Sequence, residues 1–133
     1  MNLGQATKAY FIKWSDFKTR SSRSEFWWAN LFLIILIYAI GIFNNFLFLF
    51  FYRFSVFFTV TAINISSLTS TILMLFLFVA STALAVRRLH DLNKSGWWYL
   101  LTFTIIGNIP LLIWFCTKGD EEGNRFGENP LTR

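Results

Sequence analysis

The stretch that decides the fold is residues 26–43, which read FWWANLFLIILIYAIGIF. These 18 residues include no charged side chain, and a helix needs about 17 or more such residues to cross a bilayer. Trp27 and Trp28 stand at its start, where aromatic side chains anchor helices at the membrane–water interface. We therefore interpret this stretch as a first membrane span. No short apolar core with a small-residue cleavage site precedes it, so we expect an uncleaved anchor.

The composition of the whole chain agrees with a membrane protein. Of its 133 residues, 55% are hydrophobic and 14% are charged, whereas soluble proteins carry about 25% charged residues. A chain this short cannot hide so many apolar side chains from water, which argues against a freestanding soluble enzyme. High hydrophobicity also argues against disorder. The net charge of +5 fits basic residues that flank membrane spans, and we expect no nucleic-acid partner.

Two more apolar stretches predict further spans. We assign span two to residues 71–86 and span three to residues 97–116. Residues 44–70 form an aromatic and polar connection that opens with Asn44-Asn45, and we expect these asparagines to end the first helix. Within the connection, residues 46–58 either extend the first helix or fold back along the interface. Its later part, up to residue 71, is a loop or the start of a helix.

The distribution of basic residues decides the number of spans. With three spans and a cytoplasmic N-terminus, residues 1–25 and the basic turn at residues 87–96 lie in the cytoplasm, as the positive-inside rule favours. A fourth span would move Arg87 and Arg88 outside. It would also place Arg53 within the membrane, at a cost of about 2.5–3.5 kcal/mol. We predict an all-α polytopic membrane protein with three transmembrane helices, in one domain over residues 1–133.

Span three contains the break signal Gly107-Asn108-Ile109-Pro110. Proline removes a helical hydrogen bond, and the glycine loosens the turn before it. One alternative is a kinked full crossing, which places the polar tail at residues 117–133 outside. The other is a re-entrant hairpin of two half-helices, each about 15 Å long, which returns the tail to the cytoplasm. Of the two, the sequence favours the full crossing.

Residues 1–25 predict a short amphipathic segment at the membrane surface. Apolar residues recur at spacings of three and four from Ala6 through Tyr10 to Phe17, as they do on one face of a helix. Basic residues among them are expected to reach lipid phosphates. The alternative is a cytoplasmic tail with scattered aromatic residues.

Residues 87–98, RRLHDLNKSGWW, are the densest polar stretch beside an apolar span. On a helix that continues from span two, Arg87 and Asp91 lie four residues apart, so we expect these two to pair. Three interpretations stay open for this stretch. It is a basic turn that contacts lipid phosphates, or a specific site for an anionic headgroup or phosphate, or it catalyses a reaction with His90 as acid or base.

The catalytic interpretation has the least support. His90 lies about 100° round the helix from Asp91, which makes a direct His–Asp dyad geometrically poor. No serine or cysteine nucleophile stands near it in sequence, and no carboxylate cluster suggests a metal. Cys116 is the only cysteine, which excludes an internal disulfide. We therefore predict no enzyme activity, no cofactor and no metal site.

Three segments of the chain carry distinctive motifs. They are FKTRSSRSEFW at residues 17–27, RRLHD at 87–91 followed by SGWW at 95–98, and GNRFGENP at 123–130. In this order they resemble the opening motif, the central signature and the C-terminal signature of a family of bacterial membrane proteins, the domain of unknown function 805 family. Thr19 stands where the family usually has glycine, and GDEEG at 119–123 departs from its usual tail. The resemblance implies a small integral protein of the bacterial inner membrane with no established activity.

The opposite charges of the three motifs suggest one polar assembly, in which acidic groups of a cytoplasmic tail meet the arginines. The candidates for lipid or partner binding are Arg20, Arg23, Glu25, Arg87, Arg88, His90, Asp91, Lys94, Asn124 and Arg125. The candidate interface anchors are Trp27, Trp28, Trp97 and Trp98.

Three functions compete on this sequence. The first is a non-enzymatic accessory or regulatory membrane protein that contacts anionic lipid headgroups, other membrane proteins or itself. The second is an oligomeric transporter or channel subunit, although ionisable residues are essentially missing from the spans. The third is a lipid-modifying membrane enzyme.

Overall fold

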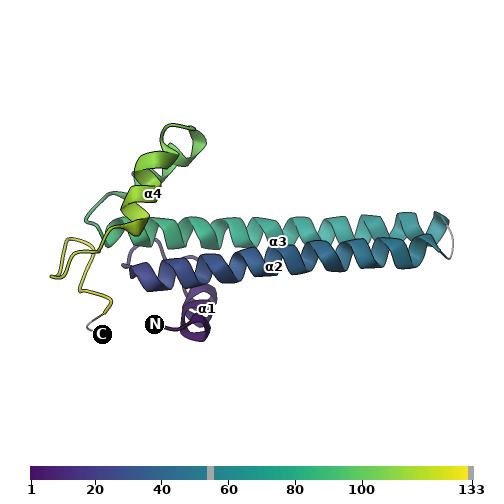
Figure 1. The fold of residues 1–133 in the computed structure, drawn as a ribbon, viewed down its shortest axis with the longest axis horizontal. Coiled ribbons are helices and arrows are strands. Elements are labelled where there is room, and N and C mark those ends of the chain that lie inside the picture. The colour runs from purple at the N-terminus through teal and green to yellow at the C-terminus, as the bar shows by residue number, and fades with distance from the viewer. Residues whose placement is uncertain (54–55, 132–133) are drawn as a thin grey trace. The chain divides into compact units, whose positions relative to one another are not determined.

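The computed structural model describes residues 1–53 and 56–131, and in this part of the chain the regular elements are all helices, as predicted (Figure 1). Its elements are α1 (Leu3–Ile12), α2 (Arg23–Tyr52), α3 (Val56–His90), the 3₁₀ helix η1 (Gly96–Phe103) and α4 (Asn108–Cys116). One isolated bridge, between Asn124 and Gly127, is the only β pairing among the described residues.

The chain divides into two compact units. The first joins Met1–Asn30 to the chain from Val79 onward, and the second is Leu31–Phe78. The second unit is a pair of helical segments, one from α2 and one from α3, which lie side by side (Figure 1). The first unit contains α1, η1, α4, the tail and the adjoining ends of the two long helices.

The prediction that Asn44 and Asn45 end the first helix is wrong, because α2 continues through them to Tyr52. Both side-chain amides donate to acceptors within the second unit, so their polar groups are satisfied while the helix continues. Asn45 Nδ2 donates to the Gly41 carbonyl at 2.8 Å. Asn44 donates to Ser70 Oγ at 3.2 Å and accepts from Ser66 Oγ.

The rest of the expected connection is also helical where the structure describes it. Residues 46–52 extend α2, and α3 already begins at Val56. Serine and threonine are tolerated in α3 because their hydroxyls bond to carbonyls one turn earlier. Thr69 donates to Ile65 and Thr71 to Ser67, at 3.0 Å and 2.8 Å. The prediction for residues 54 and 55 lies outside the described residues.

Two helices are long and apolar enough to cross a membrane, Arg23–Tyr52 and the Ile63–His90 part of α3. With 30 and 28 residues, they extend over about 45 and 42 Å, against a hydrocarbon core of about 30 Å. The third expected span is not confirmed. Residues 97–116 divide into η1 and α4, and the nine residues of α4 measure only about 14 Å.

The break between η1 and α4 lies at residues 104–107, just before the expected position. Thr104 is extended, and its hydroxyl donates to the Leu101 carbonyl and accepts from the Gly107 amide. A Cβ on Gly107 would lie 2.6 Å from the Leu101 carbonyl oxygen, so the turn needs glycine here. Pro110 causes no break, because it lies in the first turn of α4, where its missing N–H has no partner within the helix.

The N-terminal segment forms α1, which begins with a capping box between Asn2 and Gln5. Ala6 and Tyr10 are fully buried, and the Tyr10 hydroxyl lies 3.1 Å from Ser81 Oγ of α3. One side of α1 therefore packs on the protein itself. The side chains of Phe11 and Ile12 remain exposed.

Candidate functional site

Four of the candidate residues lie at the C-terminus of α3: Arg87, Arg88, His90 and, directly after the helix, Asp91. The helix ends in a Schellman motif, in which Asn93 adopts a left-handed conformation with φ 53°. The Lys94 amide donates to the Leu89 carbonyl and the Asn93 amide to the His90 carbonyl, both at 3.0 Å. These bonds satisfy carbonyls that a helix end leaves free. The motif fixes Asp91 just beyond the last turn.

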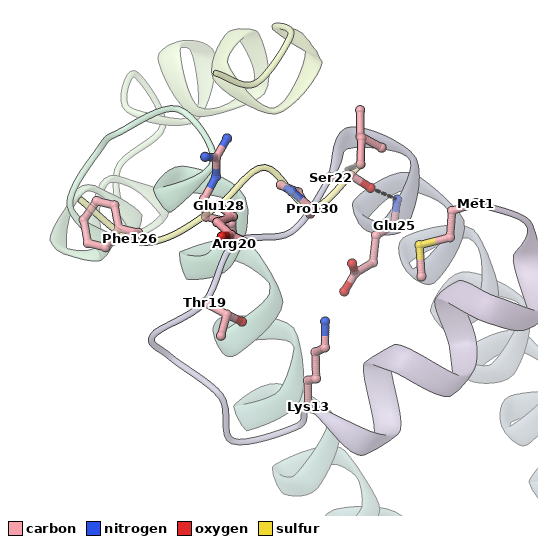
Figure 2. A pocket seen from close by; sticks show the side chains of 10 residues that line it. Met1, Lys13, Thr19, Arg20, Ser22, Glu25, Phe126, Glu128 and Pro130 are labelled. Carbon is pink, nitrogen blue, oxygen red and sulfur yellow. Dashed lines mark hydrogen bonds between the residues drawn. The ribbon is translucent and has the colours of Figure 1, made fainter. Parts of the chain in front are cut away.

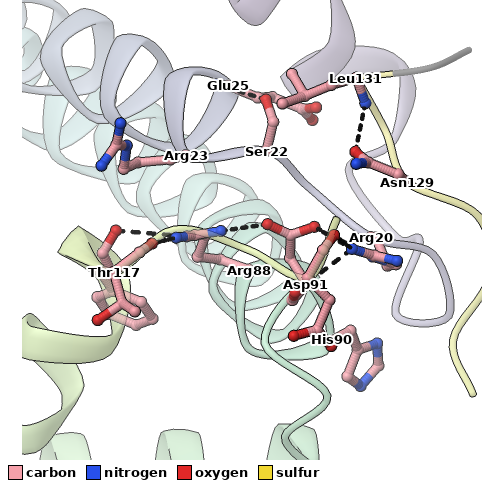
Figure 3. Close-up of polar contacts among 12 residues, drawn as sticks. Arg20, Ser22, Arg23, Glu25, Arg88, His90, Asp91, Thr117, Asn129 and Leu131 are labelled. Atoms are coloured by element: carbon pink, nitrogen blue, oxygen red, sulfur yellow. Dashed lines mark hydrogen bonds and ion pairs between the residues drawn. The ribbon is translucent and has the colours of Figure 1, made fainter. Parts of the chain in front are cut away.

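Asp91 joins two arginines from different segments (Figure 3). Arg20 Nε and Nη2 both donate to Oδ1, at 3.1 Å and 3.0 Å. Arg88 Nη1 pairs with Oδ2. All three side chains are buried. The carboxylate is thus held by two guanidinium groups in a setting where charges need partners.

The expected pair between Arg87 and Asp91 is wrong. Asp91 lies past the last helical residue of α3 and pairs with Arg88, three residues earlier. Arg87 instead pairs with Glu25 of α2, with Nη2 3.7 Å from Oε1. Its Nη1 donates to the Lys13 carbonyl. We call Arg20, Glu25, Arg87, Arg88 and Asp91 the polar cluster.

The polar cluster also holds the tail, and does so through backbone carbonyls. Arg20 donates to the carbonyls of Asp120 at 2.6 Å, Glu122 at 2.9 Å and Gly127 at 3.1 Å. Arg88 donates to the Thr117 carbonyl. The three motifs therefore meet in one assembly as hypothesised. Within the tail, Arg20 and Arg88 bind backbone carbonyls rather than the carboxylates of the acidic residues.

His90 points away from the carboxylate of Asp91 and contacts the tail. Its ring stacks on Phe126, with centroids 3.7 Å apart and planes 3° apart. Its Nδ1 donates to the Thr19 carbonyl at 3.3 Å, and its own carbonyl accepts from Asn124 Nδ2 at 3.0 Å. His90 and Asn124 thus act as docking groups between motifs.

The remaining candidates lie at the edge of this assembly. Arg23 donates to the Cys116 carbonyl at 3.3 Å, and Arg125 to the Asn93 carbonyl at 3.0 Å; both are exposed. Lys94 lies over the Trp114 ring, 4.4 Å from its centroid. The four candidate anchors, Trp27, Trp28, Trp97 and Trp98, are all exposed.

Sequence reasoning missed two residues that shape the site. Asp16 Oδ1 accepts from the amides of Lys18 at 2.9 Å and Thr19 at 3.2 Å, which fixes the loop before Arg20. The spacing of Asp16 and Thr19, typical of a side-chain turn, was an available signal. Gly119 lies against Asp91, where a Cβ would be 1.9 Å from Oδ2. Only the folded chain reveals that contact.

Two carboxyl groups of the site have shifted pKa values. Burial raises the pKa of Asp91, although the guanidinium groups of Arg88 and Arg20 oppose that rise. For Asp16, burial also favours the neutral form, but hydrogen bonds from Thr19 and Lys18 outweigh it and lower the pKa. Among the described residues, no group of three His, Cys, Asp or Glu side chains gathers to hold a metal ion.

Comparison of the sequence with known proteins assigns this chain to a family. The chain is 47% identical over 62 residues to inner membrane protein YhaI of Escherichia coli (strain K12), a match that covers 46% of this chain and 52% of that protein. The chain thus aligns with about half the length of this relative. It is 29% identical over 115 residues to inner membrane protein YhaH of the same strain, with 86% of each chain covered.

No solved structure matches the chain. The family model described as "Protein of unknown function (DUF805)" matches residues 14–128, which include the first two motifs, the third motif as far as Glu128, and the whole polar cluster. The named relatives are inner membrane proteins, and the chain itself has two apolar helices of membrane-crossing length. The chain belongs to the DUF805 family of inner membrane proteins.

Proposed function

We propose that this protein is a non-enzymatic accessory or regulatory component of the bacterial inner membrane, whose cytoplasmic side contacts anionic lipid headgroups. One observation carries the proposal: the buried charges of the motifs pair with one another and hold the tail. They act as a folded cap rather than as an open reactive site. His90 supports this view, because its ring stacks on Phe126 and its Nδ1 bonds to a carbonyl.

The proposed topology has two full crossings and a cytoplasmic tail. The two ends of the segment from η1 to α4 lie close together, because Lys94, just before η1, lies over Trp114 of α4. The end of the segment lies at the polar cluster, because Arg88 donates to the Thr117 carbonyl just after α4. A segment with both ends at one place does not cross the membrane. This supports the re-entrant alternative for residues 97–116 over a third span.

The tip of that hairpin favours contact with the membrane interior. Phe103, Ile105 and Ile106 are 76%, 92% and 81% exposed. Three such side chains in water would be costly, since each buried aliphatic or aromatic side chain is worth about 1.5–3 kcal/mol. Dipping the tip into the bilayer from the cytoplasmic side removes that cost. The exposed Phe11 and Ile12 of α1 support a position for that helix at the same surface.

Cysteine labelling tests this topology. In a Cys116→Ser background, Lys8→Cys and Glu128→Cys each introduce one thiol in an exposed position of the first unit. A membrane-impermeant maleimide should leave both unlabelled in intact spheroplasts and label both after permeabilisation. A three-span protein would instead expose the thiol at position 128, and only that one, from the outer side.

The exposed lysines of the N-terminal segment are the proposed lipid contacts. Lys8 and Lys18 are exposed, and each basic group near an anionic surface contributes about 1 kcal/mol. The protein, extracted with its surrounding lipids from vesicles of phosphatidylglycerol and phosphatidylcholine, should be enriched in phosphatidylglycerol.

The double variant Lys8→Gln/Lys18→Gln should lose that enrichment. The matched control, Arg53→Gln/Lys118→Gln, removes the same charge elsewhere and should keep it. Equal enrichment in all three proteins would overturn the lipid contact. Breakdown of lipid by the purified protein would overturn the non-enzymatic role.

A further inference from the structure

A cavity of about 310 Å³ lies in the first unit, beneath the tail (Figure 2). Its size is at the lower end of the range of about 300–1,000 Å³ for small-molecule sites. Its walls combine charged, hydroxyl and apolar side chains from the residues that flank α1, the loop after it, the start of α2 and the tail. They include Lys13, Arg20, Ser22, Glu25 and Phe126.

Two opposite charges face each other across this cavity. Figure 2 shows the Lys13 ammonium and the Glu25 carboxylate pointing toward one another. No ion pair within 4.0 Å joins them among the contacts of the described residues. Both charged groups therefore line the cavity without pairing with each other.

The Glu25 carboxylate has an unused acceptor. Glu25 is only 3% exposed, and its Oε1 has no hydrogen-bond donor within the described part of the chain. Arg87 Nη2, which also has no hydrogen-bond partner within the described part of the chain, is 3.7 Å from this oxygen, close enough for charge attraction but beyond hydrogen-bond distance. A buried carboxylate with too few donors is costly, so Glu25 favours a ligand that supplies an N–H group to the carboxylate.

The opposite side of the cavity favours an anion. Lys13 supplies a compact positive charge, which suits phosphate. Ser22 precedes the first residue of α2, and a helix N-terminus adds partial positive charge. Arg20 lines the wall as well, but its donors are engaged with Asp91 and the tail.

We propose that this cavity binds a small zwitterion that carries an ammonium and a phosphate group. The ammonium donates to the Glu25 carboxylate, and the phosphate accepts from Lys13. An anion alone would be repelled by Glu25, and a cation alone by Lys13. This chemistry occurs in the headgroup of phosphatidylethanolamine and in free phosphoethanolamine.

Calorimetric titration of the purified full-length protein tests the proposal with three probes: phosphoethanolamine, ethanolamine and inorganic phosphate. Phosphoethanolamine should bind at least tenfold more tightly than either single-charge probe. Lys13→Gln should weaken its binding at least tenfold, whereas Lys118→Gln should leave it unchanged. Lys13→Gln keeps the backbone carbonyl that Arg87 uses, so this variant should fold.

Glu25→Gln is the second arm. It should weaken binding of phosphoethanolamine at least tenfold but not that of phosphate, with the exposed Glu121→Gln as its control. Equal affinities for phosphate and phosphoethanolamine, or unchanged binding by Lys13→Gln, would overturn the proposal. Unchanged binding by Lys13→Gln would indicate that Lys13 forms an ion pair with Glu25 and does not contact the ligand.

The source of the zwitterion is decided in bilayers. If the ligand is the lipid, nanodiscs of phosphatidylethanolamine should block the binding of added phosphoethanolamine, and nanodiscs of phosphatidylglycerol should not. If it is the free compound, binding should be the same in both. Either result supports the ammonium–phosphate site, and failure of this test leaves the lipid contact of Lys8 and Lys18 standing.

Discussion

Arg20 and Asp91 lie 71 residues apart in the chain, yet Arg20 donates two hydrogen bonds to a single oxygen of Asp91, at 3.1 Å and 3.0 Å. The other carboxylate oxygen is left for Arg88. One buried carboxylate therefore ties the first motif to the second, and the same Arg20 ties both to the tail. The assembly depends on this acidic group more than on any other.

Asp91→Asn should destabilise the first unit strongly. The change removes the negative charge between two buried guanidinium groups, and breaking one side of a buried ion pair costs about 3–5 kcal/mol. Thermal unfolding in detergent should show a large fall in midpoint, and protease should cut the tail faster. Asp120→Asn is the control, since Arg20 uses only its carbonyl. Similar midpoints for both variants would contradict the central role of Asp91.

Gly119→Ala should loosen the tail by pushing on the same carboxylate. The new Cβ would lie 1.9 Å from Asp91 Oδ2 and 2.5 Å from Cγ, so one of the two segments must move. Overpacking of this kind costs about 1–3 kcal/mol. At Gly123 an added Cβ meets only the Gly127 carbonyl oxygen, at 3.8 Å. Gly123→Ala should therefore match the natural protein in limited proteolysis, and a Gly119→Ala protein that did so too would disprove the contact.

Gly107→Ala should disturb the turn between η1 and α4. Its Cβ would lie 2.6 Å from the Leu101 carbonyl oxygen, and we expect a loss of about 1–3 kcal/mol. Gly41→Ala is the matched control, because an added Cβ there meets nothing within 4 Å and alanine favours a helix by up to about 1 kcal/mol. Thermal unfolding should show a lower midpoint for Gly107→Ala and a higher midpoint for Gly41→Ala than for the natural protein. Equal midpoints would argue for one continuous helix through residue 107.

Asp16 should make stability depend on pH in the acidic range. Its folded pKa is lowered, because hydrogen bonds from Thr19 and Lys18 outweigh burial. Its stabilising effect is therefore fully present above the unfolded pKa of about 3.9 and is lost as the pH falls through the folded value. The natural protein should exceed Asp16→Asn in thermal midpoint at pH 6, and the gap should shrink at lower pH. A gap independent of pH would exclude the carboxylate as the cause.

The sequence predicted some local features well because their causes are local. Residues 26–43 form part of a long apolar helix, as their uninterrupted apolar sequence predicts. The break in residues 97–116 follows from Gly107 and its neighbours, although it comes earlier than expected. Asn44 does not end α2 as expected, because it donates to Ser70 and accepts from Ser66, both on another helix. A partner that distant in sequence cannot be read from spacing.

By itself, the sequence determined the class of protein, since long apolar stretches without charged residues need no tertiary contact to prefer a membrane. It also determined which residues carry charge beside those stretches. Only the tertiary structure decided how the charges pair: Arg87 with Glu25 rather than Asp91, and Asp91 with Arg20 and Arg88. Pairing depends on where separate segments meet in space. The same cluster holds the tail, because the buried guanidinium groups of Arg20 and Arg88 donate to backbone carbonyls of the tail.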